Sequence, residues 1–256
     1  YKLSDGNHPD RQYYIYKNII LNNLYGVDIM KEAVETAKLR LFLKLVALVE
    51  PNPFKDNLGL EPLPDIDFNI KSGNALVGIA NEDELENAMY GNIESYHMRA
   101  EVKERCYDLA KTMMRYKDIQ LGDGENFDEF KESKKELYKR QKSLNEILDK
   151  RVYEDFLGLD FYTWGKVYQP FHWYAEYYEI IAFKGGFDII IGNPPYLEMK
   201  QVQYTVSGYK SYETKAVHAM CIERASNLLC TKGCLSMIVP LSIVSTQRMK
   251  IVQDVI

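Results

Sequence analysis

The sequence lacks the long hydrophobic runs of a membrane protein. Its 256 residues include no run of about 18 apolar residues, the minimum that a bilayer-spanning helix needs. The opening residues, YKLSDGNHPD, are polar and do not resemble a signal peptide. The apolar fraction of 46% and the charged fraction of 27% are typical of a globular protein. We therefore expect a cytoplasmic protein with no membrane partner.

Cysteine and histidine are scarce, with four residues of each. The cysteines form no CxxC pair, and the histidines are too few to complete a zinc site. We expect reduced thiols and no metal site. Two Glu-x-Lys triplets of a nuclease-like kind occur at residues 101–103 and 132–134. Both lie in highly charged stretches, so we interpret them as solvated helix faces.

An overall excess of basic residues is also missing. The chain has 37 acidic residues, 32 Lys or Arg residues and a net charge of −5. Proteins that bind nucleic acids usually have a basic footprint, so the average charge argues mildly against such a partner. However, the charge is uneven, since residues 81–184 carry about −6 and residues 197–256 hold seven basic and four acidic residues. The average therefore conceals a basic C-terminal segment.

Apolar periodicity predicts strands alternating with helices. The predicted strands cover residues 23–29, 68–71, 187–191 and 234–240. The predicted helices cover residues 11–22, 31–48 and 215–229. Charged helical patterns over residues 94–119 and 127–156, separated by LGDGEN, predict an inserted helical hairpin. The alternation predicts an α/β fold with a parallel sheet, in three segments at residues 1–80, 81–184 and 185–256.

Polar residues follow three of the predicted strands. Asp28 ends the first strand, Asn74 follows the second, and Asn193 follows the third. Ligands of open parallel sheets bind outside the carboxyl ends of the strands. Asp28 could accept hydrogen bonds from two ribose hydroxyls, or it could cap the next helix. Asn74 comes after a glycine and could read the amino edge of an adenine, or it could be an ordinary turn residue.

The run Asn193-Pro194-Pro195-Tyr196 is a more specific signal. The prolines end the strand ladder and favour extended backbone at Asn193. The side-chain oxygen of Asn193 and the carbonyl of Pro194 can then converge as two acceptors for an exocyclic amine. Tyr196 offers a ring face on which a base taken out of a duplex could stack. The alternative is a strand-ending turn with a buried tyrosine.

GGFDIIIGNPPY resembles the catalytic motif of S-adenosylmethionine-dependent adenine-N6 DNA methyltransferases. Further motifs of this family are similar, in the same order along the chain, to LYGVDI, NIKSGNALVG and CIERASNLLCTKGCLSMIVP. The lead-in FHWYAEYYEIIAFKGGFD resembles that of type IIG restriction–modification and related phage-defence enzymes. The resemblance implies a Rossmann-like S-adenosylmethionine-dependent methyltransferase core, divided between residues 1–80 and 185–256, with residues 81–184 as a helical insertion. It also implies methyl transfer to N6 of a flipped adenine in double-stranded DNA.

The same resemblance assigns roles to single residues. The cofactor-binding residues would be Asp28, Ile29, Asn74 and Ala75. The catalytic residues would be Asn193, Pro194, Pro195 and Tyr196. Residues 216–218, Ala-Val-His, depart from the Asp or Asn, Leu and Tyr that the family often has. The family's Gly-rich loop has no counterpart before Asp28, so we interpret the chain as truncated at both ends, with a specificity or nuclease domain expected elsewhere in the polypeptide.

Two alternatives stay open. Methyltransferases that act on protein glutamine or on RNA use the same Asn-Pro-Pro-Tyr motif, although the helical insertion and the FHW lead-in favour the DNA enzymes. A non-catalytic DNA-binding fragment is the second alternative, because the Gly-rich loop is missing. Lys200, Lys210 and Lys215 follow the motif and could contact phosphates, or could simply be solvated.

Overall fold

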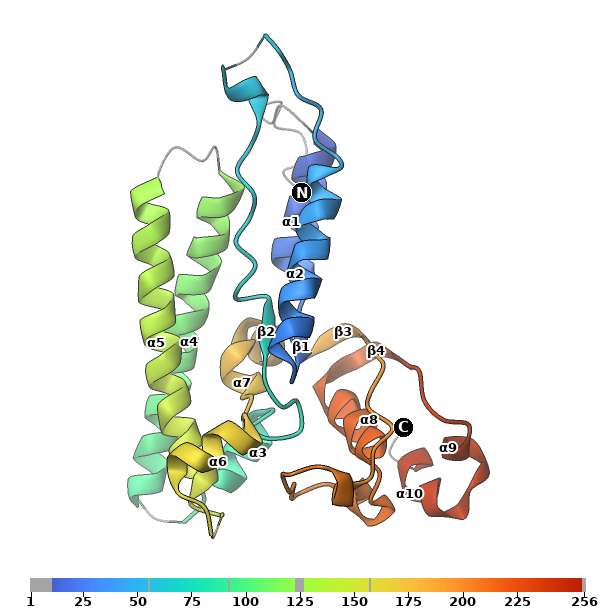
Figure 1. Ribbon diagram of the computed structural model, residues 1–256. Helices are drawn as coiled ribbons and strands as arrows, with labels where there is room; N and C mark the ends of the chain where they lie inside the picture. Colours follow the sequence, from blue (N-terminus) through green and yellow to red (C-terminus); the bar gives the residue numbers. More distant parts are fainter. Residues whose placement is uncertain (1–10, 55, 92, 123–126, 157, 255–256) are drawn as a thin grey trace. The chain divides into compact units, whose positions relative to one another are not determined.

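The chain divides into two compact units, and each unit is built from two separate segments of sequence. The structure, a computed structural model, describes residues 11–54, 56–91, 93–122, 127–156 and 158–254 (Figure 1). Unit 1 comprises Tyr1–Gly73 and Lys111–Lys139, and unit 2 comprises Asn74–Ala110 and Arg140–Ile256. Among the described residues, each unit contains helices and one two-stranded parallel sheet. The mixed α/β prediction and the parallel pairing are confirmed, whereas the single continuous sheet is not seen in these ranges.

Unit 1 packs helices around a short strand pair. Its elements are α1 (Arg11–Asn23), β1 (Gly26–Asp28), α2 (Lys31–Val46), the 3₁₀ turn η1 (Asp56–Gly59), β2 (Ile70–Ser72), the last part of α4 (Ile93–Leu121) and the first part of α5 (Phe127–Tyr153). Helix α2 is rich in Ala, Leu, Lys and Glu, which favour helix. Gly26 pairs with Ile70, and Asp28 pairs with Ser72.

Strand β2 begins at Ile70, two residues later than predicted. The preceding Asn69 lies outside the strand, and its side chain binds the end of α1. The Asn69 side chain is buried, and its Nδ2 donates to the carbonyls of Leu21 at 2.9 Å and Leu24 at 3.0 Å. These carbonyls belong to the C-terminal end of α1, where backbone acceptors lack helical partners. Asn69 therefore joins the end of α1 to the start of β2.

Two aspartates in the loop before β2 hold the helices of unit 1 together. Asp67 accepts hydrogen bonds from Lys38 of α2 at 2.8 Å and from Lys134 of α5 at 2.9 Å. Asp65 accepts a hydrogen bond from Tyr116 of α4 at 2.8 Å and also pairs with Lys134. Burial raises the pKa of Asp67, but the hydrogen bonds from Lys38 and Lys134 outweigh it and lower that pKa to about 2.

Unit 2 holds the remaining helices and the second strand pair. Its elements are α3 (Glu82–Ala88), the first part of α4, the last part of α5, α6 (Phe161–Tyr168), α7 (Trp173–Glu176), the π-helical turn η2 (Glu179–Phe183), β3 (Phe187–Gly192), the 3₁₀ turns η3 (Met199–Gln201) and η4 (Lys210–Thr214), α8 (Val217–Leu228), β4 (Leu229–Met237), α9 (Ser242–Ser245), η5 (Gln247–Met249) and α10 (Lys250–Gln253). No helix in the described ranges is long and apolar enough to cross a bilayer.

Strand β4 starts at Leu229, earlier than the predicted residue 234. Helix α8 ends at Leu228 and passes directly into extended backbone. Phe187 of β3 lies opposite Leu229, but Ile189 lies opposite Cys234, so β4 bulges between these two pairs. Regular pairing therefore begins where the sequence predicts it, and the bulge accounts for the additional residues.

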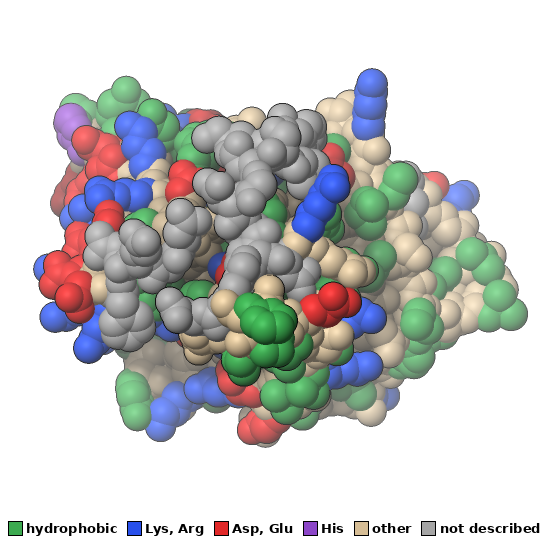
Figure 2. All heavy atoms as spheres, turned by 90° about the horizontal axis from the view of Figure 1, so that it is seen from above, with side chains coloured by type: hydrophobic (Ala, Val, Ile, Leu, Met, Phe, Trp, Pro, Cys, Tyr) green, Lys and Arg blue, Asp and Glu red, His purple; other side chains and the backbone are tan. Residues whose placement is uncertain are grey.

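Helices α4 and α5 run antiparallel, as the predicted hairpin requires (Figure 1). Arg115 pairs with Glu129 at 2.6 Å in unit 1, and Arg105 bonds to Ser143 at 3.2 Å in unit 2. Figure 2 shows acidic and basic side chains intermingled on the visible face, in keeping with such solvated helices. Two of the divisions between the units fall within the hairpin helices, after residues 110 and 139, and the proposed segment boundaries at residues 80 and 184 stay a prediction.

Candidate functional site

Asp28 lies in unit 1 at the carboxyl end of β1, as predicted. Its Oδ1 accepts a hydrogen bond from the Met30 N–H at 2.7 Å, and its backbone carbonyl accepts one from Gly73 at 2.9 Å. The N-cap residue of α2 is Met30, which makes no side-chain cap bond. Asp28 therefore shapes the turn into α2 without being its N-cap. Asp28 is exposed, and within the described part of the chain its Oδ2 makes no hydrogen bond; Ile29 beside it is 38% exposed.

Asn74 opens unit 2 and has only 3% of its surface exposed. Its Oδ1 accepts a hydrogen bond from the Leu76 N–H at 3.1 Å, which sets the orientation of the amide, because the flipped amide would place two donors together. Among the described residues, no partner meets hydrogen-bond geometry at Nδ2, although the amide lies near enough to the Tyr204 hydroxyl to oppose the rise in pKa that burial gives that hydroxyl. An unpaired buried donor suits an acceptor such as a ring nitrogen better than an amino group.

The FHW segment runs alongside the residues that follow Asn74. The Asn74 N–H donates to the Gln169 carbonyl at 2.7 Å, and the Phe171 N–H donates to the Val77 carbonyl at 2.7 Å. The Trp173 indole N–H donates to the Ala75 carbonyl at 3.0 Å. The FHW lead-in, which the sequence identifies only by resemblance, thus supports the candidate cofactor segment directly.

His172 completes this support. Its Nδ1 accepts a hydrogen bond from the Ile79 N–H at 3.1 Å, so the ring proton is on Nε2, which lies 3.0 Å from Asp149. Between these contacts, Gly78 has a φ of +120°, and an added Cβ would lie 2.5 Å from the Phe171 carbonyl oxygen. Only glycine fits this close backbone approach.

The Asn193–Tyr196 loop follows β3 directly. The Ile238 N–H donates to the Gly192 carbonyl at 3.0 Å, which joins the start of the loop to the end of β4. The Tyr196 hydroxyl lies 3.0 Å from the Ile238 carbonyl and 3.2 Å from Asn193 Oδ1. Asn193 and Pro195 are exposed, and Tyr196 is 52% exposed. The loop is therefore anchored through its tyrosine hydroxyl while its amide and ring remain accessible.

His218 lies behind this loop, in the first turn of α8. Its ring packs edge-to-face against Tyr196, with centroids 6.1 Å apart and planes at 83°. It is only 6% exposed, and within the described ranges neither ring nitrogen has a hydrogen-bond partner. Burial lowers its pKa, and the nearby Arg248 lowers it further. The sequence marks this position only as a departure from a family pattern, because unpaired nitrogens depend on packing that no local pattern reveals.

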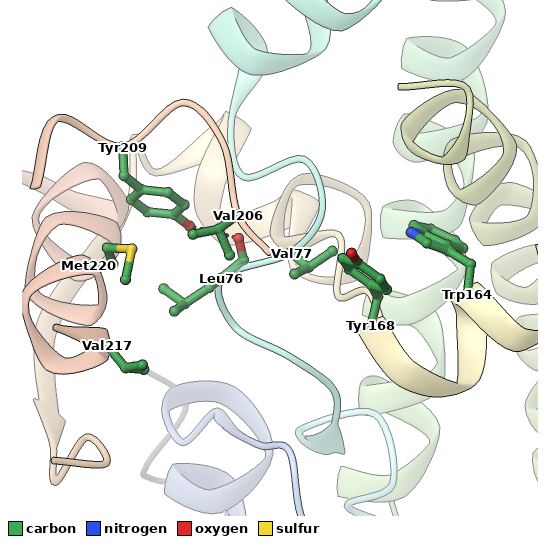
Figure 3. Packing of buried hydrophobic residues seen from close by; sticks show 8 residues of the cluster. All are labelled: Leu76, Val77, Trp164, Tyr168, Val206, Tyr209, Val217 and Met220. Atoms are coloured by element: carbon green, nitrogen blue, oxygen red, sulfur yellow. Dashed lines mark hydrogen bonds between the residues drawn. The ribbon is translucent and has the colours of Figure 1, made fainter. Parts of the chain in front are cut away.

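A hydrophobic cluster joins the Asn74 segment to α8 (Figure 3). Its buried members are Leu76, Val77, Trp164, Tyr168, Val206, Tyr209, Val217 and Met220. The Tyr209 hydroxyl donates to the Leu76 carbonyl at 2.8 Å and accepts from Arg224 Nε at 2.8 Å. The Val217 N–H also donates to the Leu197 carbonyl at 2.9 Å, just after the Asn-Pro-Pro-Tyr loop. Continuous packing within unit 2 therefore connects the Asn74 segment with that loop.

The two Glu-x-Lys triplets lie on the hairpin helices. Lys103 pairs with Glu82 and with Glu86, and Glu101 pairs with Arg105 at 2.6 Å. Lys134 is engaged by the aspartates of unit 1. Across the described ranges, no three His, Cys, Asp or Glu side chains are grouped so that they could hold a metal ion.

Comparison with known proteins identifies the family of the chain. Residues 22–255 match the Eco57I restriction-modification methylase family, and the chain belongs to this family. It is similar to a putative type II restriction enzyme and methyltransferase of Methanocaldococcus jannaschii, with 30% identity over 279 aligned positions. That alignment covers 89% of this chain and 23% of the other protein, so the chain spans about a quarter of that relative's length. No solved structure matches the chain.

Proposed function

We propose that this chain transfers a methyl group from S-adenosylmethionine to N6 of an adenine flipped out of double-stranded DNA, within a restriction–modification or phage-defence protein. The observation that carries the proposal is the accessible Asn-Pro-Pro-Tyr loop at the carboxyl end of β3. Asn193 is exposed there, and Tyr196 is half exposed and anchored at Ile238. Membership of a restriction-modification methylase family supports methyl transfer as the reaction.

The chemistry follows from the two acceptors of the loop. The lone pair of adenine N6 is delocalised into the purine ring, which makes the amine a weak nucleophile. The Asn193 side-chain oxygen and the Pro194 carbonyl would accept the two N6 hydrogens and localise the lone pair, without a formal general base. The Tyr196 ring would stack on the flipped base and hold it in place. The proton that N6 loses after transfer passes to solvent, because the loop residues are open to water.

Four residues have features that suit S-adenosylmethionine, which would supply a methyl group on a positively charged sulfur. The Oδ2 of Asp28, which makes no hydrogen bond to a described residue, suits a ribose hydroxyl, and the exposed Ile29 side chain suits the adenine face. The Nδ2 of Asn74, which is unpaired among the residues that the structure describes, suits an adenine ring nitrogen. The carbonyl of Ala75 is already bound by Trp173, so the contact from Ala75 would come from its N–H or its methyl group.

A labelled-cofactor assay tests this proposal. The full-length gene product that contains this chain is incubated with methyl-labelled S-adenosylmethionine and plasmid DNA, RNA or a glutamine-containing release factor. We expect label in DNA, recovered as N6-methyladenine after hydrolysis to nucleosides. Asn193→Ala should lower the rate by at least about 100-fold, the usual cost of removing a preorganised hydrogen-bonding group.

The matched control is Asn23→Ala, an exposed asparagine at the end of α1, which should leave the rate unchanged. Label found only in protein, only in RNA or only in cytosine would refute the DNA-adenine assignment. Equal rates for the wild type and Asn193→Ala would show that the loop is not catalytic and would favour a DNA-binding module.

A further inference from the structure

His218 is the most unusual buried polar residue in the described part of unit 2. Both of its ring nitrogens are buried without a hydrogen-bond partner among the described residues. Each unpaired buried polar group normally opposes folding, so an apolar ring would serve stability better at this place. Such unsatisfied groups in native proteins point to function, and this one adjoins the Asn-Pro-Pro-Tyr loop.

The contact with Tyr196 suggests what the imidazole does. The edge-to-face arrangement, 6.1 Å between centroids and 83° between planes, is a favoured geometry for aromatic pairs. The hydrogen bonds that Tyr196 makes with its side chain to described residues are both at its hydroxyl, to Ile238 and Asn193. A tyrosine ring held at its Cβ by the backbone and at its hydroxyl by hydrogen bonds can still turn about the axis that joins these two points. The imidazole edge is the second support that sets the ring plane.

The imidazole itself is rigidly placed. His218 belongs to the first turn of α8, where the neighbouring Val217 N–H is bound to the Leu197 carbonyl at 2.9 Å. This bond joins the base of the helix to the residue directly after Tyr196. The His218 ring and the Asn193–Tyr196 loop are therefore held at a fixed distance from each other.

The surrounding charges favour the neutral imidazole. Arg248 faces His218, and its guanidinium pairs with Glu198 at 3.1 Å and donates to the Thr214 carbonyl. Glu198 also pairs with the exposed Lys200 at 3.3 Å. A protonated His218 would lie beside the arginine, so protonation would disturb the ring contact.

We propose that His218 is a positioning residue for the methyl transfer, whose neutral imidazole fixes the plane of Tyr196 against which the target base stacks. This inference rests on the function proposed above. His218 acts through Tyr196, so at neutral pH its contribution to methyl transfer comes from the edge of its imidazole ring. Protonation of the ring nitrogens would make this contribution sensitive to acid.

Two variants of similar size separate the aromatic edge from simple space filling. His218→Phe keeps an aromatic edge, and His218→Leu fills the space without one. In the full-length protein at pH 8, we expect His218→Phe to keep the wild-type kcat, and His218→Leu to lose about threefold to tenfold, the worth of an aromatic pair. KM for DNA should change little, because phosphate contacts are untouched. Once the pH falls below the lowered pKa of His218, kcat of the wild type should fall more than kcat of His218→Phe.

His97 provides the matched control. It is an exposed residue of α4 whose ring packs on Tyr96 in the same way, with centroids 6.0 Å apart and planes at 75°. His97→Leu should leave kcat unchanged. Wild-type kcat in His218→Leu would overturn the inference, and so would a loss in His218→Phe equal to that in His218→Leu. An inactive wild type would instead contradict the proposed function.

Discussion

At the scale of single residues, Asn74 shows how one side chain can serve structure and binding separately. Its oxygen holds the Leu76 N–H, and its amide nitrogen remains unpaired among the described residues. The oxygen and the amide nitrogen are separate groups, so a substitution can remove the donor that would bind the cofactor and keep the acceptor for the Leu76 N–H.

Asn74→Ser makes this separation. A serine hydroxyl can still accept the N–H two residues on, but it is too short to replace the amide donor. We expect the thermal midpoint to change little and the affinity for S-adenosylmethionine to fall about tenfold, the value of one buried hydrogen bond. Isothermal titration calorimetry on the full-length protein measures this. Unchanged affinity would exclude Asn74 as a cofactor contact.

The sequence predicts the position of the Asn-Pro-Pro-Tyr loop better than the packing around it. The Asn-Pro-Pro-Tyr run is local and rigid, so its position at a strand end follows from residue order. The support of that loop is not local, because Ile238 and His218 lie more than 20 positions further along the chain. Nothing near Tyr196 in the sequence indicates which distant residues will pack against it.

At the scale of elements, the paired glycines before β3 differ sharply. Gly186 has a φ of +125°, and an added Cβ would lie 2.6 Å from the backbone nitrogen of Cys230. Gly185 has a φ of +75° but open space around it. Gly186 therefore sets how closely the chain before β3 approaches the start of β4, whereas Gly185 only shapes the turn.

Substitution to alanine distinguishes the two. Gly185→Ala should cost about 1 kcal/mol from left-handed backbone alone. Gly186→Ala should cost more than about 2 kcal/mol, since the clash with β4 adds to the backbone strain. Urea unfolding followed by circular dichroism measures both. Equal losses of unfolding free energy in the two variants would mean that the backbone of β4 shifts to make room for the added methyl group.

Helices were easier to predict than strands, for a physical reason. The hairpin helices and α2 are long and rest on contacts within a few residues of each other, so their sequence pattern is strong. Strands β1 and β2 have three residues each, and their pairing depends on residues more than 40 positions apart. The bulge in β4 arises from its contact with β3 and the Gly186 turn, which no local pattern contains.

At the scale of the whole molecule, the Asp67 network makes unit 1 sensitive to acid. The pKa of Asp67 falls from 3.8 to about 2 in the folded chain. A lowered carboxyl pKa stabilises the fold fully above 3.8, and this contribution is lost as pH falls through 3.8 towards 2. Asp67→Asn should cost about 1 kcal/mol at pH 7, a value reduced for solvent screening.

Unfolding curves at pH 7 and at pH 2 test this expectation. The difference between the wild type and Asp67→Asn should largely vanish at the lower pH, where the wild-type carboxyl is about half protonated in the folded chain and almost fully protonated in the unfolded chain. The exposed ion pair between Glu101 and Arg105 on α4 provides a control, and Glu101→Gln should have little effect at either pH. A constant difference across the range would mean that Asp67 acts through packing and not through charge.

The division into units also affects how the chain is made. Unit 1 needs residues 111–139 to complete its packing, and the first segment of unit 2 is synthesised before them. Asp65 and Asp67 can pair with Lys134 of α5 only after this second segment of unit 1 has been synthesised. A chain interrupted after residue 110 would therefore hold the first segment of each unit and neither unit complete.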